Sequence, residues 1–200
     1  AMQEMVPEVT SQPVKEVGSF APQGYSNLQE IGKGGMGKIY RATQDSLGRD
    51  VAIKVMHFPD DDEGVQRFMM EASILAQLDH PNIIRVFDFG QSDGMMYLVM
   101  ELVEGDTLKQ HVLKHGALSV QEFMLVSKQL VGALLEAHQQ KVIHRDIKPS
   151  NVLLRNRQGK LFSKLIDFGL VKNLSQSVDL SMTGAIMGST LASDFTSFLA

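Results

Sequence analysis

Hydrophobic periodicity changes near Gly105 from mainly strand-like to helical, and that change limits how the chain can fold. Before Gly105, short runs rich in β-branched and other apolar residues are typical of strands, and the one helical stretch among them is ended by Pro81. After it, Ser119 and Glu122 form a capping box that begins an amphipathic helix running to about Gln139. The predicted strands are a glycine-tipped hairpin around 28–40 and the runs 50–56, 83–89 and 95–101. The inward side of the long helix is expected to carry Leu125, Leu130, Val131, Leu134, Leu135 and His138.

The composition is that of an ordinary globular chain of 200 residues, 44% hydrophobic and 21% charged, long enough for one domain or two small lobes. Lys and Arg number 19 against 23 Asp and Glu, and the net charge of -4 disfavours a dedicated nucleic-acid binder. The chain has no cysteine, which excludes disulfides, thiolate nucleophiles and cysteine-bound zinc. Apolar runs are too short for a membrane segment, and the N-terminus does not resemble a signal peptide. We therefore expect a cytoplasmic protein.

A glycine cluster lies at the tip of the first predicted hairpin. Gly32, Gly34 and Gly37 match the pattern GxGxxG, which alone is a weak signal. A dinucleotide-binding fold would place these glycines between a strand and a helix, whereas here they separate two strands. Backbone N–H groups without side chains can approach polyphosphate oxygens closely, so the cluster indicates a phosphate-binding loop.

Two opposite charges occupy positions that should be apolar. Lys54 lies within the strand run 50–56, and Glu71 shares a helix face with apolar side chains. A lysine that reaches the surface along its apolar stem would explain Lys54 alone. Because two lone charges at apolar positions would both be costly, we interpret them as one ion pair, with Lys54 also contacting phosphate oxygens.

The segment 144–151 carries the strongest chemical signal. Asp146 and Asn151 are spaced so that one loop can present a proton acceptor and an amide oxygen, and Asp167 supplies a second carboxylate farther along. Magnesium prefers oxygen ligands and usually keeps several waters, so a carboxylate, an amide and phosphates would suit it. His80 and His144 are expected to serve packing and backbone hydrogen bonds.

Together these motifs resemble the eukaryotic-type serine/threonine protein kinases. Two further segments, 105–108 and 184–189, are similar to bacterial members of that family. The glycine loop, Val-Ala-Ile-Lys at 51–54, the helix glutamate, His-Arg-Asp at 144–146 and Asp-Phe-Gly at 167–169 occur in the order of that family. Lys148 followed by Pro149 resembles the serine/threonine branch. The resemblance implies an α+β, two-lobed protein kinase-like fold with a complete first lobe, a five-stranded sheet plus one helix, and a partial helical second lobe. The implied divisions are a flexible leader 1–24, lobes at 25–104 and 105–189, and a divergent tail 190–200.

The resemblance also implies a role for each matching residue. Lys54, paired with Glu71, would hold the α- and β-phosphates of ATP, Asp146 would accept the proton of a substrate hydroxyl, and Lys148 would steady the γ-phosphate. Asn151 and Asp167 would bind Mg²⁺, and Gly32, Gly34 and Gly37 would cover the phosphates. The adenine site would consist of Ile31, Ile39, Ala52, Met100, Leu153 and the backbone of Glu101 and Val103. The implied partners are proteins bearing serine or threonine, and Thr183 or a neighbouring serine is expected to be autophosphorylated and to act through Arg145.

The chain departs from the family after Ser189. No Ala-Pro-Glu element follows, so we expect the apolar surface of the long helix to lie uncovered and to favour low stability or self-association. This departure leaves open a truncated, non-catalytic nucleotide-binding regulatory module beside an active kinase. A small-molecule phosphotransferase is a third reading, which Lys148-Pro149 and the Asp-Phe-Gly element disfavour.

Overall fold

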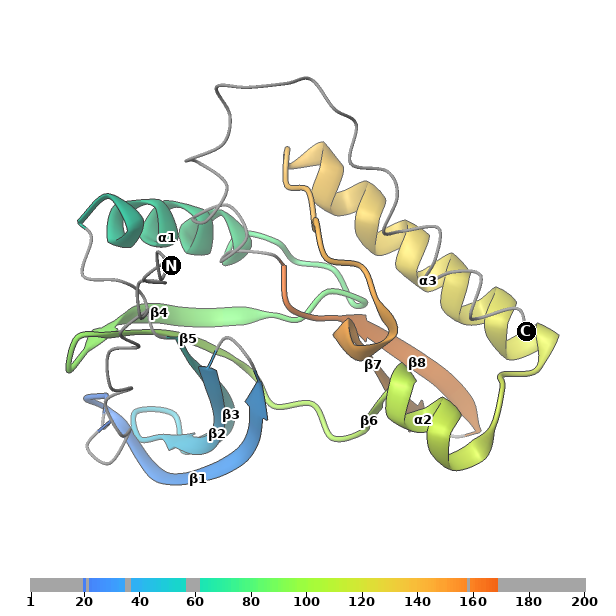
Figure 1. Ribbon diagram of the computed structural model, residues 1–200, viewed down its shortest axis with the longest axis horizontal. Helices are drawn as coiled ribbons and strands as arrows, with labels where there is room; N and C mark the ends of the chain where they lie inside the picture. The colour runs from blue at the N-terminus through green and yellow to red at the C-terminus, as the bar shows by residue number, and fades with distance from the viewer. Residues whose placement is uncertain (1–19, 21, 35–36, 57–61, 158, 169–200) are drawn as a thin grey trace, which may run out of the picture.

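The computed structural model describes residues 20, 22–34, 37–56, 62–157 and 159–168. Two groups of elements follow one another along the chain, a sheet with one helix and then a mainly helical part with small strands (Figure 1). The expectations for the tail and for phosphorylation near Thr183 fall outside the described residues, as does most of the predicted leader.

The first lobe is an antiparallel sheet of five strands in the order β1-β2-β3-β5-β4. Its elements are β1 (Tyr25–Gly34), β2 (Gly37–Gln44), β3 (Arg49–Met56), α1 (Asp62–Leu75), β4 (Val86–Ser92) and β5 (Met95–Glu101). The predicted five-stranded sheet with one helix is therefore confirmed. One boundary differs, because the fourth strand was expected from residue 83, whereas Ile83 instead forms an isolated bridge with Leu165 of the second lobe.

Alternation along β3 divides the sheet into two buried faces. Val51, Ile53 and Val55 point to the outer face and join one apolar cluster. Ala52 and Met56 point to the inner face and join the larger cluster that contains α1 and extends into the second lobe. Lys54 shares the parity of this second set, so its side chain is directed toward the second lobe. The period of two thus explains why a lysine occurs in this strand.

The outer face is covered by an aromatic residue that precedes the first strand. Phe20 is buried, and its ring lies 6.1 Å from that of Tyr40 and 5.8 Å from that of Tyr97. The hydroxyl of Tyr25 donates to Asp88 at 2.9 Å and so links the two edge strands β1 and β4. Phe20 belongs to the predicted leader, and ordered packing therefore begins before Tyr25.

The second lobe combines helices with a three-stranded sheet in the order β6-β7-β8. Its elements are β6 (Asp106–Thr107), α2 (Leu108–His115), α3 (Val120–Gln139), the short 3-10 turn η1 (Pro149–Asn151), β7 (Val152–Arg157) and β8 (Lys160–Leu165). The predicted capping box is confirmed, since Ser119 accepts from the backbone N–H of Glu122, whose side chain accepts from the backbone of Ser119. None of the described helices is long and apolar enough to cross a membrane.

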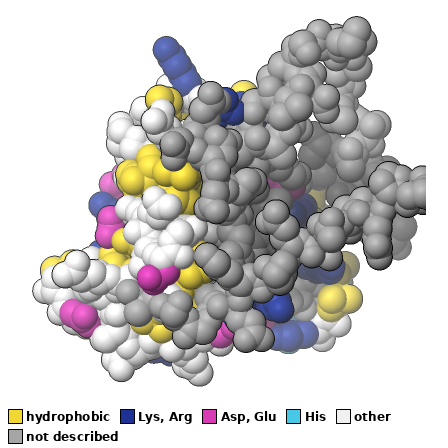
Figure 2. Space-filling view, turned by 60° about the vertical axis from the view of Figure 1, so that its left-hand side comes forward, with side chains coloured by type: hydrophobic (Ala, Val, Ile, Leu, Met, Phe, Trp, Pro, Cys, Tyr) yellow, Lys and Arg dark blue, Asp and Glu magenta, His cyan; other side chains and the backbone are white. Residues whose placement is uncertain are grey.

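The inward face of α3 was only partly predicted. Leu130 and Leu134 pack against the core, but the fully buried positions are Val126, Ala133 and Ala137, where two small side chains allow close packing. Of the other residues expected to face inward, Val131 and Leu135 are more than half exposed, and Leu125 and His138 are also exposed. Apolar side chains of this helix are therefore exposed in the described part of the chain, and they include side chains assigned to the core. In Figure 2 the left-hand side of Figure 1 comes forward, and hydrophobic side chains gather there among uncharged and charged ones.

Candidate active site

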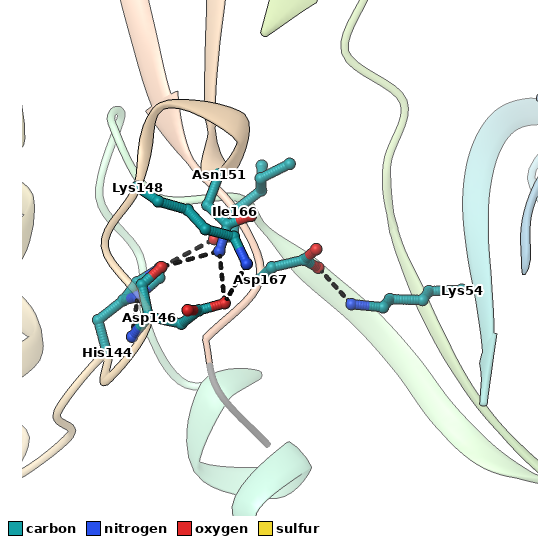
Figure 3. A network of polar contacts seen from close by, with 7 residues as sticks. All are labelled: Lys54, His144, Asp146, Lys148, Asn151, Ile166 and Asp167. Atoms are coloured by element: carbon teal, nitrogen blue, oxygen red, sulfur yellow. Dashed lines mark hydrogen bonds and ion pairs between the residues drawn. The ribbon is translucent and has the colours of Figure 1, made fainter. Parts of the chain in front are cut away.

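Side chains from both lobes converge at the end of β8 (Figure 3). Lys54 comes from the inner face of β3, and Asp167 follows β8 directly. Asp146, Lys148 and Asn151 come from the loop between α3 and β7. More than one hundred residues separate the two ends of this set, so tertiary packing alone brings them together.

Lys54 forms an ion pair with Asp167. Its Nζ lies 2.6 Å from Oδ1 of Asp167, and both side chains are partly buried, at 15% and 30% exposure. The sequence predicted a pair between Lys54 and Glu71, which stays a prediction, whereas the ion pair with Asp167 was not anticipated. Parity correctly directs the lysine to the inner face but cannot tell which of two carboxylates approaches it more closely.

The loop 144–151 holds its carboxylate from two sides. Nζ of Lys148 lies 2.8 Å from Oδ2 of Asp146. The buried amide of Asn151 donates from Nδ2 to the same oxygen at 3.1 Å and to the backbone carbonyl of Asp146 at 2.8 Å. The side chain of Asp146 is therefore fixed in direction and stays partly buried, at 15% exposure.

His144 supports this loop from within the core. Its Nε2 lies 2.9 Å from the carbonyl oxygen of Ile166, which can only accept, so Nε2 carries the hydrogen. Nδ1 then accepts from the backbone N–H of Asp146 at 3.3 Å. Burial lowers the pKa of His144, while the hydrogen bond to Ile166 opposes this effect. The expected structural role of His144 is confirmed, and the neutral ring joins the Asp146 loop to the segment that carries Asp167.

Two residues of the site have left-handed backbone conformations. Arg145 has φ of 60° and Asp167 has φ of 58°, a region that residues other than glycine rarely adopt. Such conformations cost free energy and persist only where the surroundings hold them. Here His144 contacts the backbone next to each of them, at Asp146 beside Arg145 and at Ile166 beside Asp167.

The predicted adenine residues come from both lobes. Ala52 and Met100 are buried and directly opposite each other on β3 and β5, and Ile39 lies opposite Lys54 on β2. Leu153 contributes from β7 of the second lobe, whereas Ile31 is half exposed on β1. Glu101 ends β5 and Val103 follows it, in the segment that connects the two lobes.

Gly32, Gly34 and Gly37 lie in the β1-β2 hairpin, and Gly37 pairs with Gly34. Gly37 has φ of 145°, and a Cβ at this position would lie 1.9 Å from the carbonyl oxygen of Val55. A glycine is therefore needed at 37 for contact with the neighbouring strand, whatever the hairpin binds. At Gly32, the nearest atoms to such a Cβ are 3.8 Å away in Ile39, an ordinary contact.

A metal site made of protein groups alone is absent from the described residues. They contain no cluster of three or more His, Asp or Glu side chains that could hold an ion. Asn151 is engaged through its nitrogen and Asp167 through Oδ1, so Oδ1 of Asn151 and Oδ2 of Asp167 are available as oxygen ligands. This donor set fits an ion such as Mg²⁺ that takes its remaining ligands from phosphates and water.

Sequence reasoning missed Lys164 on β8. Its Nζ forms an ion pair with Glu101 and donates to the backbone carbonyl of Ile83 at 3.2 Å. The signal resembled that of Lys54, because Lys164 lies in a strand run that also contains Leu161, Phe162 and Leu165. Asn82, Gln129 and Ser163 were also missed, and their hydrogen bonds connect the segment after α1 with α3 and β8.

The model of the protein kinase domain family matches residues 25–190 of this chain. The chain belongs to this family. The kinase domain is 41% identical over 167 residues to serine/threonine-protein kinase PrkC of Bacillus subtilis, covering 82% of this chain and 25% of that protein. It is 38% identical over 177 residues to a probable serine/threonine-protein kinase, PknB, of Lactococcus lactis, covering 87% and 28%. The predicted resemblance to bacterial serine/threonine kinases is therefore confirmed.

Solved structures agree with the fold of the kinase domain. The PknI kinase domain of Mycobacterium tuberculosis superposes with a TM-score of 0.66 and 33% identity, covering 76% of this chain and 62% of that one. Rad53 in complex with AMP-PNP gives a TM-score of 0.65 at 28% identity, covering 74% and 38%. The two-lobed kinase fold is thus confirmed. The kinase domain spans about a quarter of the length of the curated relatives it matches.

Proposed function

We propose that this kinase domain transfers the γ-phosphate of ATP to serine and threonine hydroxyls of proteins. The observation that supports this most is the convergence of Asp146, Lys148 and Asn151 in one loop with the Lys54–Asp167 pair opposite (Figure 3). Phosphoryl transfer requires mainly that a protein position the reactants and neutralise charge. This set supplies two cations, two carboxylates and an amide for that purpose.

In this proposal the nucleotide lies between the lobes. The adenine would contact Ile31, Ile39, Ala52, Met100 and Leu153, with the backbone of Glu101 and Val103 at its polar edge. Gly32, Gly34 and Gly37 would cover the phosphates, and Lys54 would neutralise charge on them. The division into lobes at 25–104 and 105–189 and the cytoplasmic location stay predictions.

Asp146 would act as the proton acceptor. Lys148 and Asn151 both contact its Oδ2, so the carboxylate is held in one orientation beside a neighbouring cation. As the substrate oxygen bonds to the γ-phosphorus, its proton would move to Asp146 and the bond to the β-phosphate oxygen would break. Lys148, which is 40% exposed, would also reach the transferred phosphate.

Asn151 and Asp167 would hold Mg²⁺ through the oxygens that their hydrogen bonds leave available. The bound ion would neutralise charge on the phosphates, which is what metal ions supply in this chemistry. The chain's own contribution is to orient the two ligands. Asn151 is held by Asp146, and the backbone of Asp167 is held by the neighbouring contact of Ile166 with His144.

The test is transfer of radiolabelled γ-phosphate from Mg-ATP to a generic basic protein, followed by identification of the labelled amino acid. We expect serine and threonine to be labelled, and Asp146→Asn to reduce the rate at least about 100-fold through loss of the proton acceptor. Asp93→Asn is the matched control, because Asp93 lies in an exposed turn with φ of 53°, which asparagine tolerates. Equal rates for Asp146→Asn and the control would contradict the proposed role of Asp146.

The alternative, a non-catalytic nucleotide-binding module, makes a different prediction in the same experiment. The chain would bind Mg-ATP, as measured by calorimetry, but the wild type and Asp146→Asn would show the same background transfer. Labelling of tyrosine alone would instead contradict the serine/threonine specificity.

A further inference from the structure

One ion pair outside the proposed catalytic set joins three segments at the boundary between the lobes. Lys164 of β8 pairs with Glu101 at the end of β5, and the two side chains are only 16% and 25% exposed. Nζ of Lys164 also donates to the carbonyl of Ile83 at 3.2 Å, and the carboxylate of Glu101 accepts from the backbone N–H of Arg85 at 2.9 Å. We refer to Glu101, Lys164 and the backbone of 83–85 as the lobe junction.

Backbone hydrogen bonds surround the lobe junction. The N–H of Ile84 donates to the carbonyl of Leu165 at 2.9 Å, and the N–H of Leu165 donates to the carbonyl of Asn82 at 2.8 Å. The N–H of Glu101 donates to the carbonyl of Arg85 at 2.9 Å. Residues 82–85 are therefore hydrogen-bonded to the end of β8 on one side and to the end of β5 on the other. The lysine and glutamate complete this connection with a direct charge pair.

The lobe junction lies close to both ends of the proposed nucleotide site. Glu101 begins the segment whose backbone would face the adenine edge, and Lys164 lies three residues before Asp167. Lys164 is also directly opposite Leu153 in the β7-β8 ladder, so the two side chains share one face of that hairpin. Leu153 is one of the residues proposed to contact the adenine. The lobe junction thus lies beside the proposed adenine site and at the end of β8, just before the carboxylate proposed to bind metal.

We propose that Lys164 is a positioning residue for the nucleotide, acting through Glu101. By joining the end of β5 to β8, it keeps the adenine-reading segment and Asp167 at the separation that one ATP molecule spans. A nucleotide binds more tightly when the protein groups that contact its two ends are already held at the right spacing. This inference rests on the proposed function, and it adds a residue that touches neither the nucleotide nor the transferred phosphate.

The experiment compares Lys164→Met with Lys164→Arg and Lys160→Met in the full chain. Methionine keeps the apolar stem and removes the charge, whereas arginine keeps the charge. Lys160 is exposed at the other end of the same strand and serves as the matched control. Mg-ATP affinity is measured by calorimetry, together with KM for ATP, kcat and the midpoint of thermal unfolding.

We expect Lys164→Met to raise the Kd and KM for Mg-ATP at least five-fold, with a smaller change in kcat. Lys164→Arg should bind Mg-ATP within two-fold of the wild type, as should Lys160→Met. Glu101→Gln should weaken affinity in the same direction, and its combination with Lys164→Met should add little further loss, because both changes remove one interaction. Amide hydrogen exchange at Ile84 and Leu165 should become faster in Lys164→Met.

Three outcomes would overturn the inference. If Lys164→Met unfolds at a lower temperature but its folded form binds Mg-ATP like the wild type, the lobe junction is merely structural. If Lys164→Arg fails to restore the affinity, the charge pair is not the cause. If the wild type itself binds no Mg-ATP, the proposed function fails, and the role of Lys164 in positioning nucleotide fails with it.

Discussion

At the residue scale, Lys54 and Asp167 show that a charge in a partly buried position is stabilised by one specific partner. An ammonium on the inner face of a strand needs a partner, and it meets the carboxylate that follows β8 at 2.6 Å. The same reasoning applies to His144, whose two ring nitrogens are both used by backbone groups. Each of these side chains joins segments that the chain order keeps apart.

Lys54→Met should abolish phosphoryl transfer with a modest loss of stability. The variant removes the cation proposed for the phosphates, and transfer should fall at least about 100-fold. Because Asp167 is 30% exposed, water can hydrate its unpaired carboxylate, so the free energy of unfolding should fall by only about 1–2 kcal/mol. Urea denaturation and the radiolabel assay measure the two effects. The control is Lys38→Met, which removes the ion pair of Lys38 with Glu30. Unchanged transfer by Lys54→Met would contradict the proposed contact of Lys54 with the phosphates.

His144 should make the stability of the domain depend on pH below neutrality. Its pKa in the folded protein lies below the usual 6.5, so the unfolded chain binds more protons as the pH falls from 6.5 toward the folded value. The free energy of unfolding should therefore be level above pH 7 and fall by up to about 1.4 kcal/mol per pH unit within that window. Urea denaturation from pH 5.5 to 7.5 measures it. The difference between wild type and His144→Phe should change across this range, and a difference independent of pH would refute the assignment.

At the scale of elements, the hairpin of β1 and β2 is set by contact with its neighbour as much as by any ligand. Gly37 pairs with Met56 on β3, and the carbonyl of Val55 approaches where a side chain would stand. The GxGxxG pattern alone would have assigned this glycine to phosphate binding. The structure adds a packing reason, since β2 could not lie in register on β3 with a larger residue there.

Gly37→Ala should therefore destabilise the first lobe in the absence of nucleotide. Its Cβ would lie 1.9 Å from a backbone oxygen, and φ of 145° is strained for alanine, so we expect a loss of about 2–3 kcal/mol. Gly32→Ala is the comparison, because its Cβ meets only Ile39 at 3.8 Å, and its unfolding free energy should change by about 0.5 kcal/mol or less. Urea denaturation without ATP separates the two, and equal stabilities would show that β2 can move away from β3.

At the scale of the whole molecule, the core is continuous between the lobes, and among the described residues one side of α3 carries exposed apolar side chains. The larger apolar cluster extends from Met56 and Phe68 in the first lobe to Val126 and Leu165 in the second. On α3, in contrast, apolar side chains such as Val131 and Leu135 are more than half exposed. Contiguous exposed apolar surface favours association.

We expect the chain to self-associate through this side of α3. Replacing Val131 and Leu135 together by glutamine should reduce concentration-dependent association in sedimentation experiments, with a change in unfolding free energy within about 0.5 kcal/mol, because both side chains are exposed. Leu113→Gln on α2 removes a side chain that is 77% exposed and is the control. Association that persists unchanged in the α3 variant would place the contact elsewhere.

Local chemistry made much of this domain predictable. The residue types and spacing of 144–151 indicated a loop that presents Asp146 and Asn151, and the capping box at Ser119 located the start of α3 within one residue. The apolar run around Lys54 indicated a charged side chain that needs a partner. These properties depend on residues close together in the chain, whose geometry is limited by backbone sterics and hydrogen bonding.

Tertiary packing alone decided the remainder. That Lys54 pairs with Asp167 and that Lys164 meets Glu101 depend on how the two lobes meet. That α3 buries its alanines while exposing Leu135 depends on how it packs against β8 within the second lobe. The local pattern identifies side chains that need a partner. Which partner lies within reach is a distance between elements as many as 113 residues apart, and it is set by the packed core of the whole molecule.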